Sequence, residues 1–195
     1  MTIFDEAIIF AVKAHEGQLR KNDSMPYITH PIEVAAITST ITNDVVTLSA
    51  AMLHDVIEDT IITEEELERQ FGKEVCELVL SETENKHYEL PAEATWRQRK
   101  EESLKVLRNS TDRRVKIVWV ADKLSNMRAF TRQYKRVGDS LWQNYNMKDK
   151  SQQHWYYSEV LKATEELREY YAWRELNELV GFVFEGKKPW ETSEV

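Results

Sequence analysis

The sequence contains a single cysteine, few glycines and prolines, and no long hydrophobic run. Cys76 alone cannot form an internal disulfide. With 5 Gly and 4 Pro among 195 residues, both residue types fall below their average use of roughly 7% and 5%. No apolar stretch approaches the about 20 residues that a bilayer-spanning helix needs. These absences predict that the protein has few turns, forms no internal disulfide and does not cross a membrane. They also predict that it resides in a reducing cytoplasm.

A surplus of basic residues is also lacking. The formal net charge is −8 and the sequence pI is about 5.3, which argues against a general nucleic-acid or membrane-surface binder. An anionic ligand would therefore have to meet a local basic patch. The start, "MTIFDEAIIFAVKAHEG", carries charges inside its apolar pattern and does not resemble a signal peptide.

Apolar residues recur at helical spacing along most of the chain, which predicts an all-α fold. The length suits one domain over residues 1–195, with C-terminal helices from about 140 to 195 packing on the core. In the first helix Gly17 is expected to act as a C-terminal stop. Pro31 suits a first helical turn and places His30 at a helix start. The expected inward stripe of the first helix is Phe4, Ala7, Ile8, Ala11, Val12 and His15.

Further helices follow from caps and periodicity. Asn43 is expected to cap a helix that continues through residue 60, with Val46, Ala50, Leu53 and Ile57 facing inward. Thr63 and Glu66 form a capping-box pattern for a short helix that ends near Gly72. The segment "VKIVWV", 115–120, reads as a helix because the 3.6-residue period continues beyond it. Residues 81–95 form a polar loop that is long enough to suggest a function, and a helix resumes near Trp96.

The stretch "AAMLHDVIEDT", residues 50–60, ends an apolar helix with five polar side chains, four of them ionisable. On one helix, His54 would share a face with Glu58 and Asp55 with Asp59, because residues four apart are neighbours. Imidazole nitrogens and carboxylate oxygens together suit a divalent transition metal, which needs further ligands from elsewhere. His30 and Asp122 are the candidates.

Structural alternatives stand beside this metal hypothesis. A His-Asp pair at a helix end is usually a solvated cap, and Asp122 could form an ordinary ion pair with Lys123 or Arg128. However, Glu58 and Asp59 at a helix C-terminus oppose the macrodipole unless a cation compensates them, which favours a function. Spacing alone supports only a hypothetical metal site.

Three motifs, "AHEGQLRKNDSMPYITHP", "AAMLHDVIEDT" and "ADKLSNMR", occur in this order. Together they resemble the HD-domain hydrolases of the RelA/SpoT type, including the small single-domain alarmone hydrolases of the metazoan SpoT homologue type. The resemblance covers roughly residues 4 to 130. It implies an all-helical HD bundle with one divalent metal, commonly Mn²⁺. It also implies hydrolysis of the guanine nucleotide (p)ppGpp, with pyrophosphate released from the 3′ position.

The resemblance also implies roles for individual residues. The metal ligands would be His30, His54, Asp55 and Asp122, and Glu58 with Asp59 would activate the attacking water. Arg20 and Lys21 would grip the nucleotide, where a guanidinium can stack on a purine and an ammonium can meet phosphate. Asn126 would contact the sugar. His15 is expected to support the site rather than to bind the metal.

Two features of the chain depart from that family. There is no room for the synthetase and regulatory regions of the long bifunctional enzymes, so only hydrolysis is expected. The loop "SETENKHYELPAEATWRQRK" lacks the "DDK" wording typical of alarmone hydrolases, although Trp96, Arg97, Arg99 and Lys100 resemble the positively charged segment that follows it. The alternatives are an HD phosphohydrolase for another nucleotide 3′-phosphate or phosphodiester, and a non-catalytic HD module that binds a nucleotide or metal.

Overall fold

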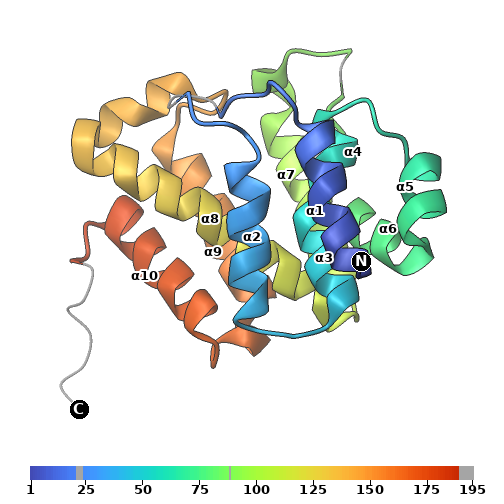
Figure 1. Cartoon of the computed structure of the whole chain (residues 1–195). Helices are drawn as coiled ribbons and strands as arrows, with labels where there is room; N and C mark the ends of the chain where they lie inside the picture. The colour runs from blue at the N-terminus through green and yellow to red at the C-terminus, as the bar shows by residue number, and fades with distance from the viewer. Residues whose placement is uncertain (21–23, 88, 189–195) are drawn as a thin grey trace.

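The computed structural model describes residues 1–20, 24–87 and 89–188, and nearly all regular structure in these ranges is helical (Figure 1). The elements in chain order are α1 (Ile3–Ala14), α2 (Thr29–Ser39), α3 (Val45–Leu53), α4 (Val56–Asp59), α5 (Glu64–Phe71), α6 (Lys73–Leu80), α7 (Ala92–Asn109), α8 (Arg113–Val137), the 3₁₀ helix η1 (Gly138–Asn144), α9 (Lys150–Ala163), the 3₁₀ helix η2 (Glu165–Leu167) and α10 (Tyr171–Glu185). Within the described ranges β-type pairing is limited to one isolated bridge, Leu19 with Pro26. The all-α prediction is confirmed. None of the helices described combines the length and the apolar character that crossing a bilayer requires.

Helix α1 begins with a capping box, in which Thr2 and Asp5 each accept a backbone N–H of the other. Ala7 and Ala11 are fully buried where α1 packs on α3. Val12, expected in the inward stripe, is 46% exposed. It follows Ala11 by one residue, which turns it about 100° away from the buried face, so the predicted stripe was too wide.

The helix predicted to run unbroken to residue 60 is divided in two. Its N-cap is Asp44 rather than Asn43, because the Asp44 carboxylate accepts hydrogen bonds from the backbone N–H and the hydroxyl of Thr47. His54 and Asp55 form a turn between α3 and α4, where Asp55 has φ −96° and ψ −3°. This is the sparsely populated bridge region between helix and strand. The prediction of one continuous helix is therefore wrong.

Other predicted boundaries agree more closely. Thr63 and Glu66 form the expected capping box of α5, and Gly72 ends that helix with φ +82°, a conformation that favours glycine. Residues 115–120 lie within α8, so the helical interpretation of this segment is confirmed. Helix α7 begins at Ala92, four residues before the expected Trp96, and its N-cap is Pro91, whose carbonyl oxygen accepts the backbone N–H groups of Ala94 and Thr95.

The longest helix, α8, crosses the middle of the molecule, with α5 and α6 on one side and α10 on the other (Figure 1). It packs against α2, α3, α9 and α10. Its inward side chains include Trp119 and Leu124, and each such buried side chain contributes about 1.5–3 kcal/mol to folding. Because α2 and α3 also pack on each other, the start of α2, the end of α3 and the middle of α8 meet in one place.

Candidate metal centre and adjoining hollow

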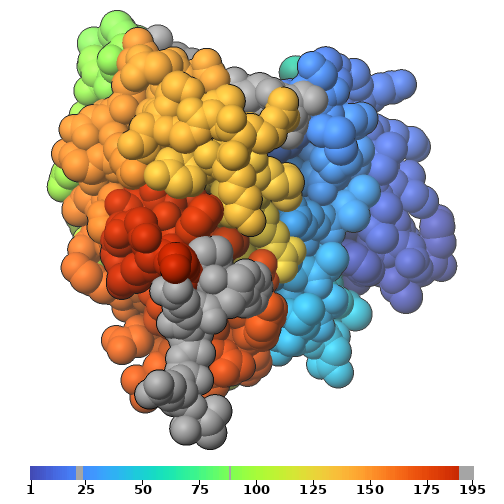
Figure 2. All heavy atoms as spheres, turned by 90° about the vertical axis from the view of Figure 1, so that its left-hand side faces the viewer, coloured from blue at the N-terminus to red at the C-terminus, as the bar shows by residue number. Residues whose placement is uncertain are grey.

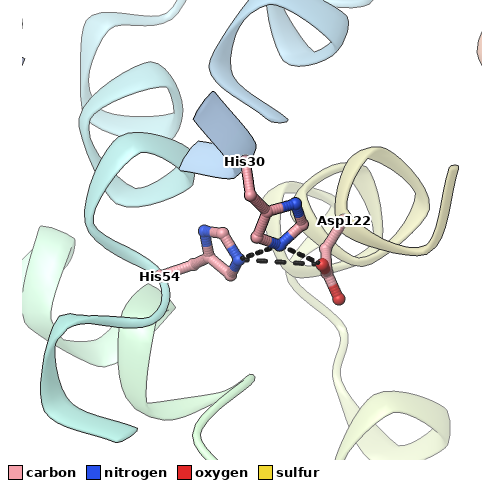
Figure 3. A group of neighbouring side chains, drawn as sticks. All are labelled: His30, His54 and Asp122. Carbon is pink, nitrogen blue, oxygen red and sulfur yellow. Dashed lines mark hydrogen bonds and ion pairs between the residues drawn. The ribbon is translucent and has the colours of Figure 1, made fainter. Parts of the chain in front are cut away.

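Three predicted ligand side chains meet where α2, α3 and α8 converge (Figure 3). His30 comes from the first turn of α2, His54 from the turn after α3, and Asp122 from the middle of α8. One ligand atom from each lies within 4.8 Å of the other two. His30 Nε2 is 2.9 Å from Asp122 Oδ1 and 3.3 Å from His54 Nε2. All three residues are buried.

Asp55, the fourth predicted ligand, reaches the same point from the α3–α4 turn. Its Oδ2 lies 3.1 Å from His54 Nε2 and 3.5 Å from His30 Nε2. The Tyr27 hydroxyl donates a hydrogen bond to Asp55 Oδ2, with 2.6 Å between the two oxygens. The break after α3 therefore does what one continuous helix could not, because adjacent helical side chains diverge by about 100°, whereas His54 and Asp55 here face the same point.

The other nitrogen of each imidazole ring faces away from this cluster. His54 Nδ1 lies 2.8 Å from the carbonyl oxygen of Ala51, which can only accept, so Nδ1 carries a proton. His30 Nδ1 lies 2.8 Å from Ser125 Oγ. When Nδ1 of a neutral ring donates outward, Nε2 presents a lone pair. With both rings neutral and Nδ1 protonated, the centre gathers two imidazole lone pairs and two carboxylate oxygens, which repel one another unless a proton or a cation lies among them.

The electrostatics follow from the same packing. Burial lowers the pKa of His30. Burial also opposes the charged form of His54, but the carboxylates of Asp55 and Asp122 outweigh it and raise its pKa well above the ordinary value. The pKa of Asp55 is lowered by the two rings despite its burial, and that of Asp122 by Lys123 and the rings. Both carboxylates are therefore ionised at neutral pH, as metal ligands must be.

The alternative of an ordinary ion pair at Asp122 is only part of the picture. Lys123 does pair with Asp122 Oδ2, while Oδ1 faces the two histidines. Arg128, the other suggested partner, binds Glu33 and Glu175 instead. One oxygen of Asp122 is thus neutralised by a cation and the other is left for the cluster.

The acid pair Glu58 and Asp59 borders the cluster and is compensated by a lysine that sequence reasoning missed. Lys86 Nζ lies 2.6 Å from Glu58 Oε1 and 3.1 Å from Asp59 Oδ1. The second oxygen of Glu58 accepts the backbone N–H of Glu84 at 2.9 Å. Burial raises the pKa of Glu58, and Asp55 adds to this effect while Lys86 opposes it. The cation required at this helix end comes from the 81–91 loop.

The predicted substrate residues are placed as follows. Arg20 Nη2 donates to Asn126 Oδ1 at 3.1 Å, and Asn126 Nδ2 donates to Asp122 Oδ1 at 2.7 Å. These two hydrogen bonds link Arg20 and Asn126, which were predicted to bind the nucleotide, to the ligand cluster. Lys21 lies outside the described residues. His15 stacks on Tyr27 with ring centroids 4.8 Å apart, consistent with a supporting role.

Two adjoining hollows open beside the cluster. The smaller, of about 190 Å³, is bordered by Asp55, Asp122 and the acid pair. The larger, of about 570 Å³, is bordered by Arg20, Asn126 and the acid pair, and by aromatic side chains of the C-terminal half. The charged and tyrosine side chains that line the hollows but were absent from the site prediction include Tyr27, Glu82, Glu84, Lys86, Lys100, Lys123 and Tyr156. The only sequence signal for Glu82, Glu84 and Lys86 was the length of the polar loop 81–95, which suggested a function. The loop sequence did not indicate where these side chains lie.

Comparisons with known proteins identify relatives of this chain. The sequence profile described as "HD domain" matches residues 7–146. A GTP pyrophosphokinase of Myxococcus xanthus is 37% identical over 130 residues, which are 66% of this chain and 17% of that protein. The bifunctional (p)ppGpp synthase/hydrolase SpoT of Escherichia coli (strain K12) is 41% identical over 125 residues, 63% of this chain and 17% of that protein. The chain thus matches only a small part of the length of these curated relatives.

Solved structures agree over most of their length. A metazoan orthologue of SpoT, described as hydrolysing ppGpp, superposes with a TM-score of 0.73 at 27% identity, covering 92% of this chain and 94% of that one. A protein of Listeria monocytogenes EGD-e superposes with a TM-score of 0.69 at 29% identity, covering 80% and 99%. The predicted resemblance to RelA/SpoT-type proteins is confirmed, and the chain belongs to the HD domain family.

Proposed function

We propose that this protein is a metal-dependent phosphohydrolase that removes the 3′-diphosphate of guanosine 3′,5′-bis(diphosphate) and releases pyrophosphate. The observation that carries the proposal is the convergence of His30, His54, Asp55 and Asp122 on one point beside an acid pair. The SpoT relative, a bifunctional (p)ppGpp synthase/hydrolase, and the metazoan orthologue, which hydrolyses ppGpp, support this choice of substrate.

The donor set fits one divalent ion. Two neutral imidazole nitrogens and two ionised carboxylate oxygens suit a divalent first-row metal, and we propose Mn²⁺ because carboxylate oxygens are ligands that suit it. The ion would be held by His30, His54, Asp55 and Asp122. When bound, it supplies Lewis acidity that polarises a phosphoryl oxygen and makes water more acidic.

The protein's own groups would then handle the proton. Glu58 and Asp59 border the hollow that His30, Asp55 and Asp122 also line, so either carboxylate can accept a proton from a water that attacks phosphorus. Lys86 fixes both carboxylates through the contacts described above. This arrangement positions the acceptor before substrate arrives, which lowers the entropic cost of the reaction.

Cations around the larger hollow would bind the anionic nucleotide. Arg20, Lys86, Lys100 and Lys123 border it, although the chain as a whole carries a net charge of −8. We propose that Arg20 and Asn126 contact the nucleoside. Lys21, which lies outside the described residues, is proposed to bind the nucleotide as well. The acidic composition supports a small nucleotide rather than a nucleic acid as partner, and we place the protein in the cytoplasm.

Product analysis tests this function. The purified protein is incubated with Mn²⁺ and guanosine 3′,5′-bis(diphosphate), and the products are separated by anion-exchange chromatography. We expect GDP and pyrophosphate in equal amounts, no reaction with GTP, and no reaction for His54→Ala. Release of orthophosphate without pyrophosphate would reject the mechanism and favour a phosphomonoesterase.

A further inference from the structure

The side of His30 that faces away from the cluster is connected to a chain of polar groups. His30 Nδ1 lies 2.8 Å from Ser125 Oγ, and Ser125 Oγ lies 2.8 Å from Glu33 Oε2. Glu33 Oε1 accepts from Arg128 Nη1 at 3.1 Å. His30 and Ser125 are 3% and 1% exposed, so water does not compete for this contact. Nothing in the proposed reaction uses Ser125, Glu33 or Arg128.

The direction of each hydrogen bond in this chain is fixed by its far end. Arg128 can only donate, and the ionised carboxylate of Glu33 beside it can only accept. The Ser125 hydroxyl must therefore give its single proton to Glu33. Its oxygen is left to accept, so the proton between Ser125 and His30 belongs to Nδ1 of the ring. Nε2 then presents its lone pair to Asp55, His54 and Asp122.

We propose that Ser125 and Glu33 are positioning residues that hold His30 in the tautomer and orientation in which Nε2 can bind the ion. The inference deepens the proposed metal site and rests on it. His54 obtains the same tautomer from the backbone carbonyl of Ala51, which substitution cannot remove. At His30 the tautomer is set instead by the side chains of Ser125 and Glu33. Substituting a group that orients a metal ligand typically changes metal affinity about 10–100-fold.

The chain extends to the C-terminal helix. Arg128 donates from Nε and Nη2 to the two oxygens of Glu175, at 2.8 and 2.6 Å. This two-pronged contact fixes the guanidinium that orders Glu33. Figure 2 shows the C-terminal helices, in orange and red, beside yellow α8 and the light-blue segment that contains α2. Side chains of α2, α8 and α10 thus meet behind His30.

The test measures Mn²⁺ affinity directly, by electron paramagnetic resonance of the free ion during titration. Ser125→Ala removes the acceptor, and Glu33→Ala frees the hydroxyl to donate toward the ring. We expect the dissociation constant for Mn²⁺ to rise about 10–100-fold in both variants. Ser125→Thr retains the hydroxyl and is expected to remain close to wild type. Long-range ¹H–¹⁵N correlation spectra of histidine-labelled protein should show His30 protonated at Nδ1 in wild type and an altered tautomer ratio in Ser125→Ala.

Thr131→Ala is the matched control. This threonine is also a buried hydroxyl of α8, and its Oγ1 has no hydrogen-bond partner within the described residues. It should lose no Mn²⁺ affinity. Wild-type affinity in a folded Ser125→Ala protein would overturn the inference, as would equal losses in Ser125→Ala and Thr131→Ala. Because the readout is binding, a wild-type protein that binds Mn²⁺ but leaves the nucleotide intact rejects only the proposed reaction.

Discussion

Glu58 and Asp59 are neighbours in sequence and share Lys86, but their other contacts differ. Glu58 accepts a loop N–H, whereas Asp59 Oδ2 lies 2.9 Å from the Tyr27 hydroxyl. Replacing Glu58 by Gln keeps the shape of the side chain and removes the base. We expect Mn²⁺ to remain bound while kcat falls about 10²–10⁴-fold, the usual contribution of general-base catalysis. Metal titration and steady-state kinetics on the same preparation measure both.

Asp59→Asn is the comparison for this variant, and we expect it to share the phenotype because either carboxylate can hold the proton. Loss of metal in parallel with activity would make Glu58 a ligand. Nearly full turnover would reduce it to a surface charge.

Lys86 should set the acidic limb of the pH profile. Burial raises the pKa of Glu58 and Lys86 lowers it, so removing the lysine should raise that pKa further. A base is active only above its pKa, so the acidic limb of kcat/KM for Lys86→Met should move to higher pH, and activity should fall at any pH on the limb. Lys86→Arg keeps the charge and serves as control. Identical limbs in wild type and Lys86→Met would exclude Glu58 as the titrating base.

The positions of some site residues could be predicted from the sequence, and the position of Lys86 could not. His30, His54, Asp55 and Asp122 lie in recognisable motifs, and the structure brings all four together. Lys86 lies in a loop without periodicity, where neither helical nor strand spacing says which way a side chain points. Only the three-dimensional course of the loop reveals that Lys86 reaches the acid pair.

At the scale of elements, the division between α3 and α4 could not be read from periodicity. Residues 50–60 contain no glycine or proline, the usual signals of a helix break. The contacts at the turn are tertiary, because the Tyr27 hydroxyl donates to Asp55 and α8 brings Asp122 Oδ1 within 3.7 Å of His54 Nε2. Element types were therefore predictable from the sequence, while this boundary depends on residues far along the chain.

The loop before α7 is tied to that helix by a buried carboxylate. Glu84 pairs with Arg99, and its Oε2 lies 2.5 Å from Lys100 Nζ. Glu84→Ala would leave two partly or fully buried cations without their anion, which typically costs about 3–5 kcal/mol. Urea unfolding followed by circular dichroism measures the free energy of unfolding.

The control for this loop prediction is the exposed pair on the same helix, Arg97 with Glu101. Glu101→Gln should cost at most about 1 kcal/mol, as is usual for solvated ion pairs. Equal losses in Glu84→Ala and Glu101→Gln would show that the Glu84 contacts do not hold the loop.

At the scale of the whole molecule, the C-terminal helices are bound to the part that matches the HD profile. Helix α9 packs on α7 and α8, and α10 packs on α8 and α9. These contacts support the proposal that residues 1–195 form one domain, although the profile itself ends at residue 146. The ligands come from α2, the α3–α4 turn and α8, which are far apart in sequence, so only the folded chain assembles them.

Metal binding should therefore stabilise the entire fold. A ligand present at 100 times its dissociation constant stabilises the folded state by about 2.7 kcal/mol, and each kcal/mol raises Tm by about 2–4 °C in a domain of this size. We expect Mn²⁺ to raise Tm by roughly 5–10 °C and a chelator to reverse the change, measured by differential scanning calorimetry. In His54→Ala the Tm should respond to neither, because one of the converging ligand atoms is gone. A shift of wild-type size in His54→Ala would place the stabilising ion elsewhere in the protein.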